Sequence, residues 1–285
     1  MPGHISLGQG GGNMADMRTG DSGAALPAAG PARPADAGSA VPADAGSAIP
    51  AEVAKFDALA ARWWDPRGPM GALHAMNPLR VGWVDQRVRA RFGGPIHGSG
   101  GRLLDVGCGA GLAAEALARL GHDVLGLDAA GEAVAAARAH AEGKGLSLAY
   151  RAGTAEGLAA EGLRFPVVTA LEVIEHVADP AAFLRLLGRL VEPGGLLFVS
   201  TINRTLRSLV VAKLGAEYVV RLLPVGTHEW GRFITPAELG ALAAAGGFRV
   251  QEVSGMVFDL RRRAWRAGAD LGVNYIAALG RSEVR

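Results

Sequence analysis

LLDVGCGAG at residues 103–111 is the stretch that decides the fold: an apolar run breaks into three glycines at alternate positions. An alanine- and leucine-rich helical pattern follows, from about Leu112 to Leu120. Glycine lacks a Cβ, so the backbone can turn sharply there and lie directly against a ligand. The free N–H groups of the following helix then point into the turn. The stretch therefore predicts a strand, a tight turn and a helix that hold a nucleotide-like ligand.

The spacing of the glycines indicates which ligand this is. Dinucleotide-binding turns read G-x-G-x-x-G, but here Leu112 stands where the third glycine of that pattern belongs, which disfavours a nicotinamide-dependent oxidoreductase. The next apolar run, 124–128, ends in Asp128, where a carboxylate would accept both hydroxyls of a ribose. The two features together resemble the class I S-adenosylmethionine-dependent methyltransferases. This resemblance implies cofactor contacts from Gly107, Gly109, Gly111 and Asp128.

Short β-rich runs alternate with helical runs along the rest of the chain. We expect strands near 102–107, 123–128, 147–151, 166–172, 195–201, 248–253 and 273–277, and helices near 111–120, 131–143, 155–161, 180–191 and from 235. This alternation predicts an α/β fold with helices on both faces of a parallel sheet. With the resemblance, we expect a Rossmann-like class I methyltransferase fold with a mostly parallel seven-stranded sheet and an N-terminal helical cap.

Residues 1–50 differ in composition from the rest of the chain. They are rich in glycine, alanine, proline and serine, and PADAGSA occurs at 34–40 and again at 42–48. Such a segment buries too little apolar surface to offset the entropy cost of ordering it. We therefore expect a disordered low-complexity tail over 1–50 and one domain over 51–285.

Charge and cysteine content narrow the function classes. The net charge of +2 gives no reason to expect a nucleic-acid partner. No run of eighteen apolar residues and no basic-then-apolar leader occurs, so we expect neither a membrane span nor export. The single cysteine, Cys108, excludes a disulfide framework and suits a cytoplasmic protein, with the thiol as a small buried filler beside the ligand.

The segment before the glycine turn carries two further motifs. F-D-A-L at 56–59 is followed by W-W-D-P at 63–66, and L-H-x-x-N-P-x-R ends at Arg80. Two adjacent tryptophans cannot both face one core, so at least one should line a groove or cover a ligand. These motifs are similar to those of the ubiquinone-biosynthesis O-methyltransferases. The resemblance implies that Arg80 contacts the cofactor; the alternative is a helical cap that only packs on the sheet.

A second chemical motif, L-E-V-I-E-H-V-A-D-P at 171–180, follows the fourth expected strand. If the turn is helical, Glu172, Glu175 and His176 at i, i+3 and i+4 converge, and two carboxylates with an imidazole can bind a divalent cation. The resembled family has this segment, which implies Mg²⁺ there and a contact of Leu171 with the adenosyl group. The alternatives are an acid-rich turn without a metal, and plain strand core at Leu171.

Residues 204–232 are expected to form a substrate- or membrane-facing insertion. Within it, 208–224 is mostly apolar with basic residues at its flanks, which suits either a helix lying on a membrane surface or a lid. The G-T-H-x-W-x-x-F motif at 226–233 again matches the resembled family. A peripheral site on the inner membrane follows from the resemblance, whose substrates carry polyprenyl chains. The basic run at 261–263, with Trp265 and Arg266, is interpreted as a solvated loop, and contact with lipid head groups is the alternative.

The resemblance implies O-methylation of polyprenyl catechols and of 3-demethylubiquinol, with S-adenosylmethionine as donor and other ubiquinone-synthesis enzymes as partners. Removal of the acceptor's proton needs a base. The candidates are His176, Glu175 and His228. Two alternatives stay open at this point. One is a soluble small-molecule catechol methyltransferase, and the other is a non-catalytic cofactor-binding regulator, which would have no use for the acidic turn.

Overall fold

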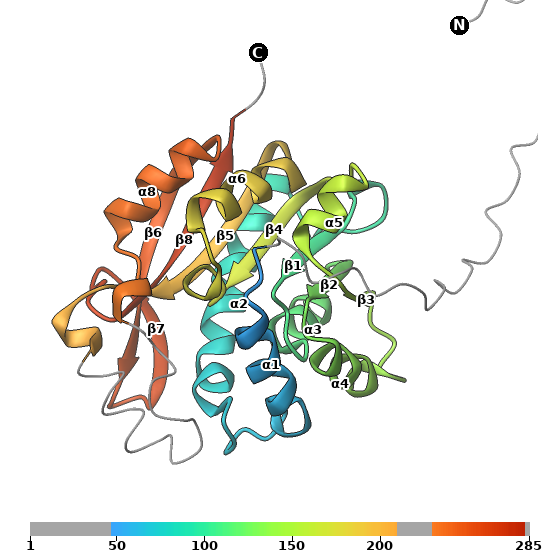
Figure 1. Cartoon of the computed structure of the whole chain (residues 1–285), viewed down its shortest axis with the longest axis horizontal. Coiled ribbons are helices and arrows are strands. Elements are labelled where there is room, and N and C mark those ends of the chain that lie inside the picture. Colours follow the sequence, from blue (N-terminus) through green and yellow to red (C-terminus); the bar gives the residue numbers. More distant parts are fainter. Residues whose placement is uncertain (1–46, 210–229, 283–285) are drawn as a thin grey trace, which may run out of the picture. The chain divides into compact units, whose positions relative to one another are not determined.

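One twisted sheet runs through residues 47–209 and 230–282, the part of the chain that the computed structural model describes (Figure 1). The order of its eight strands is β3-β2-β1-β4-β5-β8-β6-β7. The strands are β1 Leu103–Val106, β2 Val124–Asp128, β3 Leu148–Ala152, β4 Phe165–Leu171, β5 Val191–Ile202, β6 Phe248–Asp259, β7 Ala264–Gly268 and β8 Asn274–Arg281. Strands β1 to β5 pair in parallel, and β8, β6 and β7 continue the sheet antiparallel. The mostly parallel α/β fold is confirmed.

The expected count of seven strands is wrong for these described residues, because β7 is an additional edge strand. Its residues stood next to the basic run that we interpreted as a solvated loop. Arg261–Arg263 are indeed exposed, in the turn between β6 and β7. Trp265 on β7 is half-buried and packs edge-on against Phe258 of β6 at 5.5 Å between ring centroids. A five-residue strand between exposed basic residues offers too little alternation to separate it from a loop.

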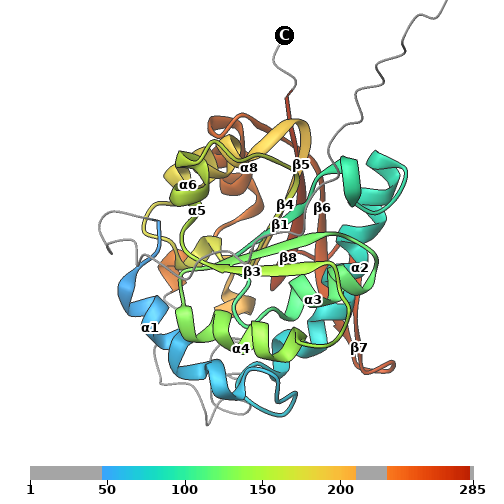
Figure 2. The same ribbon diagram turned by 90° about the vertical axis from the view of Figure 1, so that its right-hand side faces the viewer.

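Helices cover both faces of the sheet (Figure 2). The helices are α1 Pro50–Leu59, α2 Gly71–Phe92, α3 Leu112–Arg119, α4 Gly131–Ala141, α5 Ala155–Ala160, α6 Pro180–Leu190 and α8 Pro236–Ala245, with 3₁₀ turns η1 Ala60–Arg62, η2 Gly98–Gly100, η3 Ile174–His176 and η4 Trp230–Arg232. Successive side chains of a strand point to opposite faces. Leu104 accordingly joins the core under α5, α6 and α8, and Leu103 joins the core under α2, α3 and α4.

Local signals fix several helix starts. Thr235 accepts a hydrogen bond from the backbone N–H of Glu238, and Glu238 accepts one from the backbone N–H of Thr235, which completes a capping box at α8. Asp179 caps α6 by accepting from the N–H groups of Ala181 and Ala182 at 2.8 and 3.0 Å. A cap of this kind stabilises a helix by about 1 kcal/mol. The helix start predicted from Thr235 is confirmed.

The folded domain begins before the boundary expected at residue 50. Ser47 donates its backbone N–H to Glu156 at 2.6 Å, its carbonyl accepts from Ala178 at 3.1 Å, and Ala48 pairs with Val177 in a single β-bridge. Residues 1–46, which hold the rest of the predicted tail, lie outside the described residues. No described helix combines the length and the hydropathy needed to cross a bilayer.

Candidate functional site

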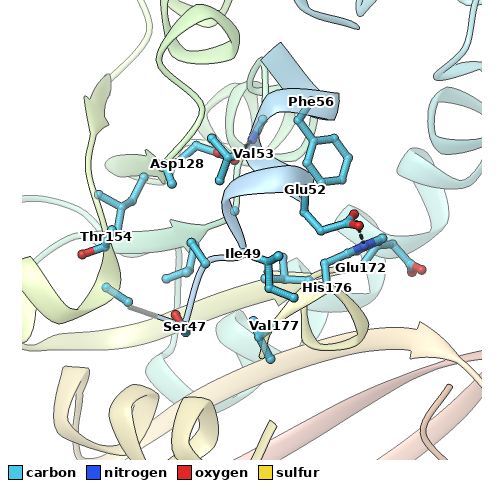
Figure 3. A pocket seen from close by; sticks show the side chains of 18 of the residues that line it. Ser47, Ile49, Glu52, Val53, Phe56, Asp128, Thr154, Glu172, His176 and Val177 are labelled. Atoms are coloured by element: carbon cyan, nitrogen blue, oxygen red, sulfur yellow. Dashed lines mark hydrogen bonds and ion pairs between the residues drawn. The ribbon is translucent and has the colours of Figure 1, made fainter. Parts of the chain in front are cut away.

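A pocket of about 140 Å³ lies at the carboxyl ends of the parallel strands (Figure 3). Its walls come from residues after β1, β2, β3 and β4, where ligands collect in open α/β sheets. Asp128 and Thr154 lie on one side of it, and Glu172 and His176 lie on the other, with residues of α1 between them (Figure 3). We call the first side, with Gly107, Gly109 and Asp128, the glycine-turn end. We call the second, with Glu172, Glu175 and His176, the acidic end.

The glycine-turn end is held by backbone hydrogen bonds. Asp128 accepts the N–H of Gly109 on Oδ2 at 2.7 Å and the N–H of Ala130 on Oδ1 at 2.8 Å. Each oxygen is therefore fixed by one donor and keeps capacity for a ligand hydroxyl. Burial raises the pKa of Asp128, and the two backbone hydrogen bonds oppose that rise. Gly107 and Gly109 line the pocket with φ angles of +70° and +53°, which favour glycine.

Gly111 serves packing rather than the pocket wall. It is not among the residues that line the pocket, and a Cβ added there would lie 2.0 Å from the Tyr150 hydroxyl oxygen. Tyr150 thus fills the space behind the turn and supports it. Cys108 is buried beside this ring, as expected for a filler residue. Leu171 does line the pocket, so its position suits the predicted adenosyl contact.

The acidic turn does not have the geometry that the motif spacing suggested. Only Ile174–His176 form a turn of 3₁₀ helix, and Glu172 precedes it with φ +59°. The three side chains therefore point to different partners. Glu172 accepts from the Ser200 hydroxyl at 2.7 Å and Glu175 from the Thr201 hydroxyl at 2.9 Å, while His176 Nδ1 lies 3.1 Å from Glu52.

Within residues 47–209 and 230–282, no three His, Cys, Asp or Glu side chains are grouped to hold a metal ion. The predicted Mg²⁺ ligands Glu172, Glu175 and His176 are therefore not grouped around one ion position in this arrangement, although the carboxyl groups of Glu172 and Glu175 interact with each other. The physical reason is the backbone at Glu172: a left-handed residue before a 3₁₀ turn breaks the i, i+3, i+4 alignment that an α-helix would give.

Burial shifts the pKa values of Glu175 and His176 in opposite directions. Burial and the nearby charge of Glu172 raise the pKa of Glu175 well above its usual range, which favours its protonated form. Burial lowers the pKa of His176, and the carboxylate of Glu52 only partly opposes this, so the imidazole is neutral. His176 lines the pocket and Glu175 does not. Of these two predicted bases, the structure thus presents His176 to a ligand.

Arg80 lies behind the pocket wall. It is 3% exposed and is not among the lining residues. Its Nη1 is 4.0 Å from Glu172, its Nη2 donates to Asn77 at 3.3 Å, and its Nε has no hydrogen-bond partner among the described residues. A buried guanidinium with an unused donor is costly unless an anion completes it. The predicted contact with a cofactor carboxylate stays a prediction.

Asp105 is a site residue to which the sequence analysis gave no role. Thr169 donates to its Oδ1 at 2.6 Å, while Oδ2 is buried without a hydrogen-bond partner in the described structure. Burial raises the pKa of Asp105 to about 6, although the hydrogen bond from Thr169 and the charge of Arg80 lower it. An acid inside an otherwise apolar strand was the signal that could have marked it, because an unpaired carboxylate is expensive to bury.

The N-terminal segment supplies one wall of the pocket, which the sequence analysis largely missed. Ser47, Ile49, Glu52, Val53 and Phe56 all line it. Part of this wall fell inside the segment that we interpreted as a tail. These residues of the cap therefore also line the pocket, whereas Arg80, for which the packing-only alternative was stated, does not.

The two tryptophans divide as expected. Trp63 lines the pocket, whereas Trp64 donates to the carbonyl of Ala110 at 3.0 Å and stacks on His140 at 3.4 Å between ring centroids. The prediction that at least one of them lines a groove is confirmed.

Residues 210–229 lie outside the described part of the chain. They include the candidate base His228 and nearly all of the expected membrane-facing segment, so both stay predictions. The polar residues at the end of β5 and directly after it lie within the described part of the chain. Ser200 and Thr201 support the acidic turn, while Thr205 accepts the backbone N–H of Ser208 at 2.9 Å.

The sheet order, the glycine turn and the carboxylate after β2 define the class: the protein has a class I methyltransferase fold. The methyltransferase domain family matches residues 83–253. Magnesium protoporphyrin IX methyltransferase from Synechocystis has a similar structure, with a TM-score of 0.55 and 17% sequence identity, over 84% of this chain and all of that one.

Curated relatives narrow the class to one family. Ubiquinone biosynthesis O-methyltransferase from Azorhizobium caulinodans is 52% identical over 79% of this chain and 90% of its own length. The protein of the same name from Cereibacter sphaeroides is 49% identical over 80% of this chain and 94% of its own length. The chain belongs to the family of ubiquinone biosynthesis O-methyltransferases.

Proposed function

We propose that this protein transfers the methyl group of S-adenosylmethionine to a hydroxyl of a polyprenyl catechol, and of 3-demethylubiquinol, in ubiquinone synthesis. One observation supports the proposal: a single pocket has a carboxylate with capacity for ribose hydroxyls at one end and a neutral histidine paired with a carboxylate at the other. The names of the relatives supply the quinone-type acceptor.

The glycine-turn end would hold the donor. Asp128 accepts the ribose hydroxyls, and Gly107 and Gly109 let the backbone approach the donor without a Cβ in the way. Leu171 packs against the adenosyl group, and Arg80 stands behind the wall for the methionine carboxylate. Arg80 needs an opening beside Glu172 to make that contact, because it does not line the pocket in this arrangement.

The acidic end would remove the acceptor's proton. A phenol has a pKa near 10, so its hydroxyl must lose the proton as the methyl group arrives. Burial raises the pKa of Glu52, but hydrogen bonds from Lys55 and His176 outweigh burial, so its pKa is lowered and it is ionised. An ionised Glu52 accepts Nδ1–H of His176 and so selects the tautomer in which Nε2 is the basic nitrogen, the atom that we assign to take the phenol proton. The acceptor oxygen then attacks the methyl carbon, and the donor leaves as a thioether.

The Mg²⁺ that the resemblance implies has no ligand group in the described arrangement of the side chains. It would require Glu172, Glu175 and His176 to come together around one point, and the described structure does not group them in this way. No step is therefore assigned to a cation, and the metal requirement stays a prediction. When bound, Mg²⁺ would lower the pKa of a chelated catechol. Turnover that EDTA abolishes and Mg²⁺ restores would mean that the acidic turn rearranges around an ion.

Membrane contact and partner enzymes also stay predictions. Their support is the apolar segment 208–224 with its flanking basic residues, most of which lies outside the described residues. Co-sedimentation with anionic lipid vesicles tests the contact. Deletion of 210–224 should abolish sedimentation and leave turnover of a short-chain acceptor in detergent.

The central experiment measures conversion of S-adenosylmethionine to S-adenosylhomocysteine by the purified protein with a short-chain prenyl catechol. Plain catechol is the matched acceptor, and donor binding is measured separately by calorimetry. We expect turnover with the prenyl catechol and weaker turnover with catechol. Donor binding without turnover of either acceptor would contradict the proposed acceptor class, and absence of donor binding would contradict the methyltransferase itself.

A further inference from the structure

Two aromatic rings form one wall of the pocket outside the residues given a role above. Phe56 and Trp63, which we call the aromatic wall, both line the pocket, and their ring centroids lie 6.1 Å apart. Phe56 also packs edge-on against His176 at 5.4 Å. Trp63 is 5% exposed, and its indole N–H is buried without a hydrogen-bond partner among the described residues. A buried donor in a pocket wall indicates that a ligand oxygen completes it.

The aromatic wall lies next to the position that holds the ribose. A Cβ added to Gly109 would be 2.2 Å from Cζ2 of Trp63, so the indole ring lies directly against this glycine. The N–H of Gly109 is bound by Asp128. In S-adenosylmethionine the sulfur is one carbon beyond the ribose ring. A donor held by Asp128 and extending toward the acidic end therefore carries its sulfur past Trp63 and then Phe56.

The sulfur carries the whole charge difference between substrate and product. It is a cationic sulfonium in the donor and a neutral thioether in S-adenosylhomocysteine. The face of an aromatic ring attracts a cation, most strongly where water is excluded. Glu52 and Glu172, which line the same pocket, add negative potential at this end.

We propose that Phe56 and Trp63 recognise the positive charge of the sulfonium, so that the protein binds S-adenosylmethionine in preference to the neutral product. The inference rests on the proposed donor and is independent of the acceptor. It assigns to the aromatic wall a role in product release: once the methyl group leaves, the attraction between the rings and the cation is lost and the product dissociates faster.

The test compares the dissociation constants of three ligands, measured by calorimetry, in the full-length protein. They are S-adenosylmethionine, S-adenosylhomocysteine and sinefungin, in which an ammonium-bearing carbon replaces the sulfonium. In F56L we expect the two cationic ligands to bind about 3- to 30-fold more weakly, with little change for the product. In W63L we expect the same selective loss for the two cationic ligands, in addition to a loss common to all three ligands from the missing indole N–H. W63F keeps an aromatic face but lacks the N–H, so it should weaken all three ligands alike and preserve the preference.

The matched control is the neighbouring tryptophan. Trp64 contacts His140 and Ala110 and does not line the pocket, so W64L should leave the ratio of product to donor dissociation constants unchanged. F56L carries the test alone if W63L does not fold. Equal weakening of donor and product in F56L and W63L would overturn the inference and leave the proposed function intact. Wild-type protein that binds neither ligand would overturn the proposed donor and the inference together.

Discussion

At the glycine-turn end of the pocket, the groups proposed to contact the donor are backbone atoms or a carboxylate fixed by backbone N–H groups. At the acidic end they are side chains held by other side chains. Asp128 receives its two hydrogen bonds from Gly109 and Ala130, within a turn whose shape the glycines determine. Glu172, Glu175 and His176 depend instead on Ser200, Thr201 and Glu52, which come from distant positions in the chain.

This difference determines which end of the pocket a sequence motif can predict. A backbone-built site needs only local sequence, because glycine positions and strand ends determine where its atoms lie. A site built from side chains depends on partners that no spacing rule contains. At the acidic end, burial also raises the pKa of Glu175 and lowers the pKa of His176. Chemistry is therefore expected at the acidic end and donor binding at the other, and mutations should separate the two.

The largest expected effect breaks the acidic end alone. H176N should lower kcat about 1000-fold, because it removes the proposed base, which typically contributes 100- to 10,000-fold. The donor dissociation constant should change less than about two-fold, since the hydrogen bonds that hold Asp128 come from Gly109 and Ala130. Single-turnover kinetics and calorimetry measure the two quantities.

H97N is the control for the histidine change, because His97 is exposed and is not among the residues that line the pocket. It should behave as the wild type. Retained turnover in H176N would move the base to another residue, and His228 would be tested next.

A second change tests whether the close contact between Gly109 and the Trp63 ring constrains the glycine turn. G109A should lower the free energy of unfolding by about 3 kcal/mol, since its φ is +53° and its Cβ would meet the Trp63 ring at 2.2 Å. G143A is the matched control, with φ +72° but no atom within 4 Å, and should cost about 1 kcal/mol. Urea unfolding measures the free energy of unfolding of both variants. Equal losses of stability would show that the Trp63 ring can move aside without a measurable free-energy cost.

Asp105 lies in β1, two residues before the glycine turn begins at Gly107, and its carboxyl group also interacts with Arg80. Its pKa rises from 3.8 to about 6 on folding, so the folded state holds this proton more tightly than the unfolded chain. Its contribution to stability is complete below about pH 4 and is lost as the pH rises through 6, an effect of about 3 kcal/mol.

D105N should therefore lack this part of the pH dependence. The difference in unfolding free energy between the wild type and D105N, measured in urea from pH 4 to pH 8, should change sharply between pH 4 and pH 6. Curves that run parallel over this range would mean that Asp105 is not the buried acid that titrates.

The sequence predicted the parallel strands, the helices on both faces and the position of Asp128, because periodicity and strand ends are local properties. It did not predict that Glu172 would be left-handed, so the expected metal cluster rested on a helix that is absent from the described turn. It also assigned Ser47 and Ile49 to a tail, since low-complexity residues carry no signal for a wall formed by contact with Val177 and Glu156. In both cases the sequence analysis lacked a contact between residues far apart in the chain: Ser200 with Glu172 in the acidic turn, and Ser47 with Glu156 in the pocket wall.

The smallest expected effect concerns ligand binding at the glycine-turn end. D128N should weaken binding of S-adenosylmethionine and S-adenosylhomocysteine alike by about 50-fold, because a charged acceptor for the ribose hydroxyls is lost. D57N is the matched control: Asp57 also accepts two backbone N–H groups, from Glu132 and Ala133, but does not line the pocket. It should lower stability by about 1 kcal/mol and leave both affinities unchanged. If D57N weakened the ligands as much as D128N, the loss would come from loosening of the fold, and the glycine-turn end would depend on distant support as the acidic end does.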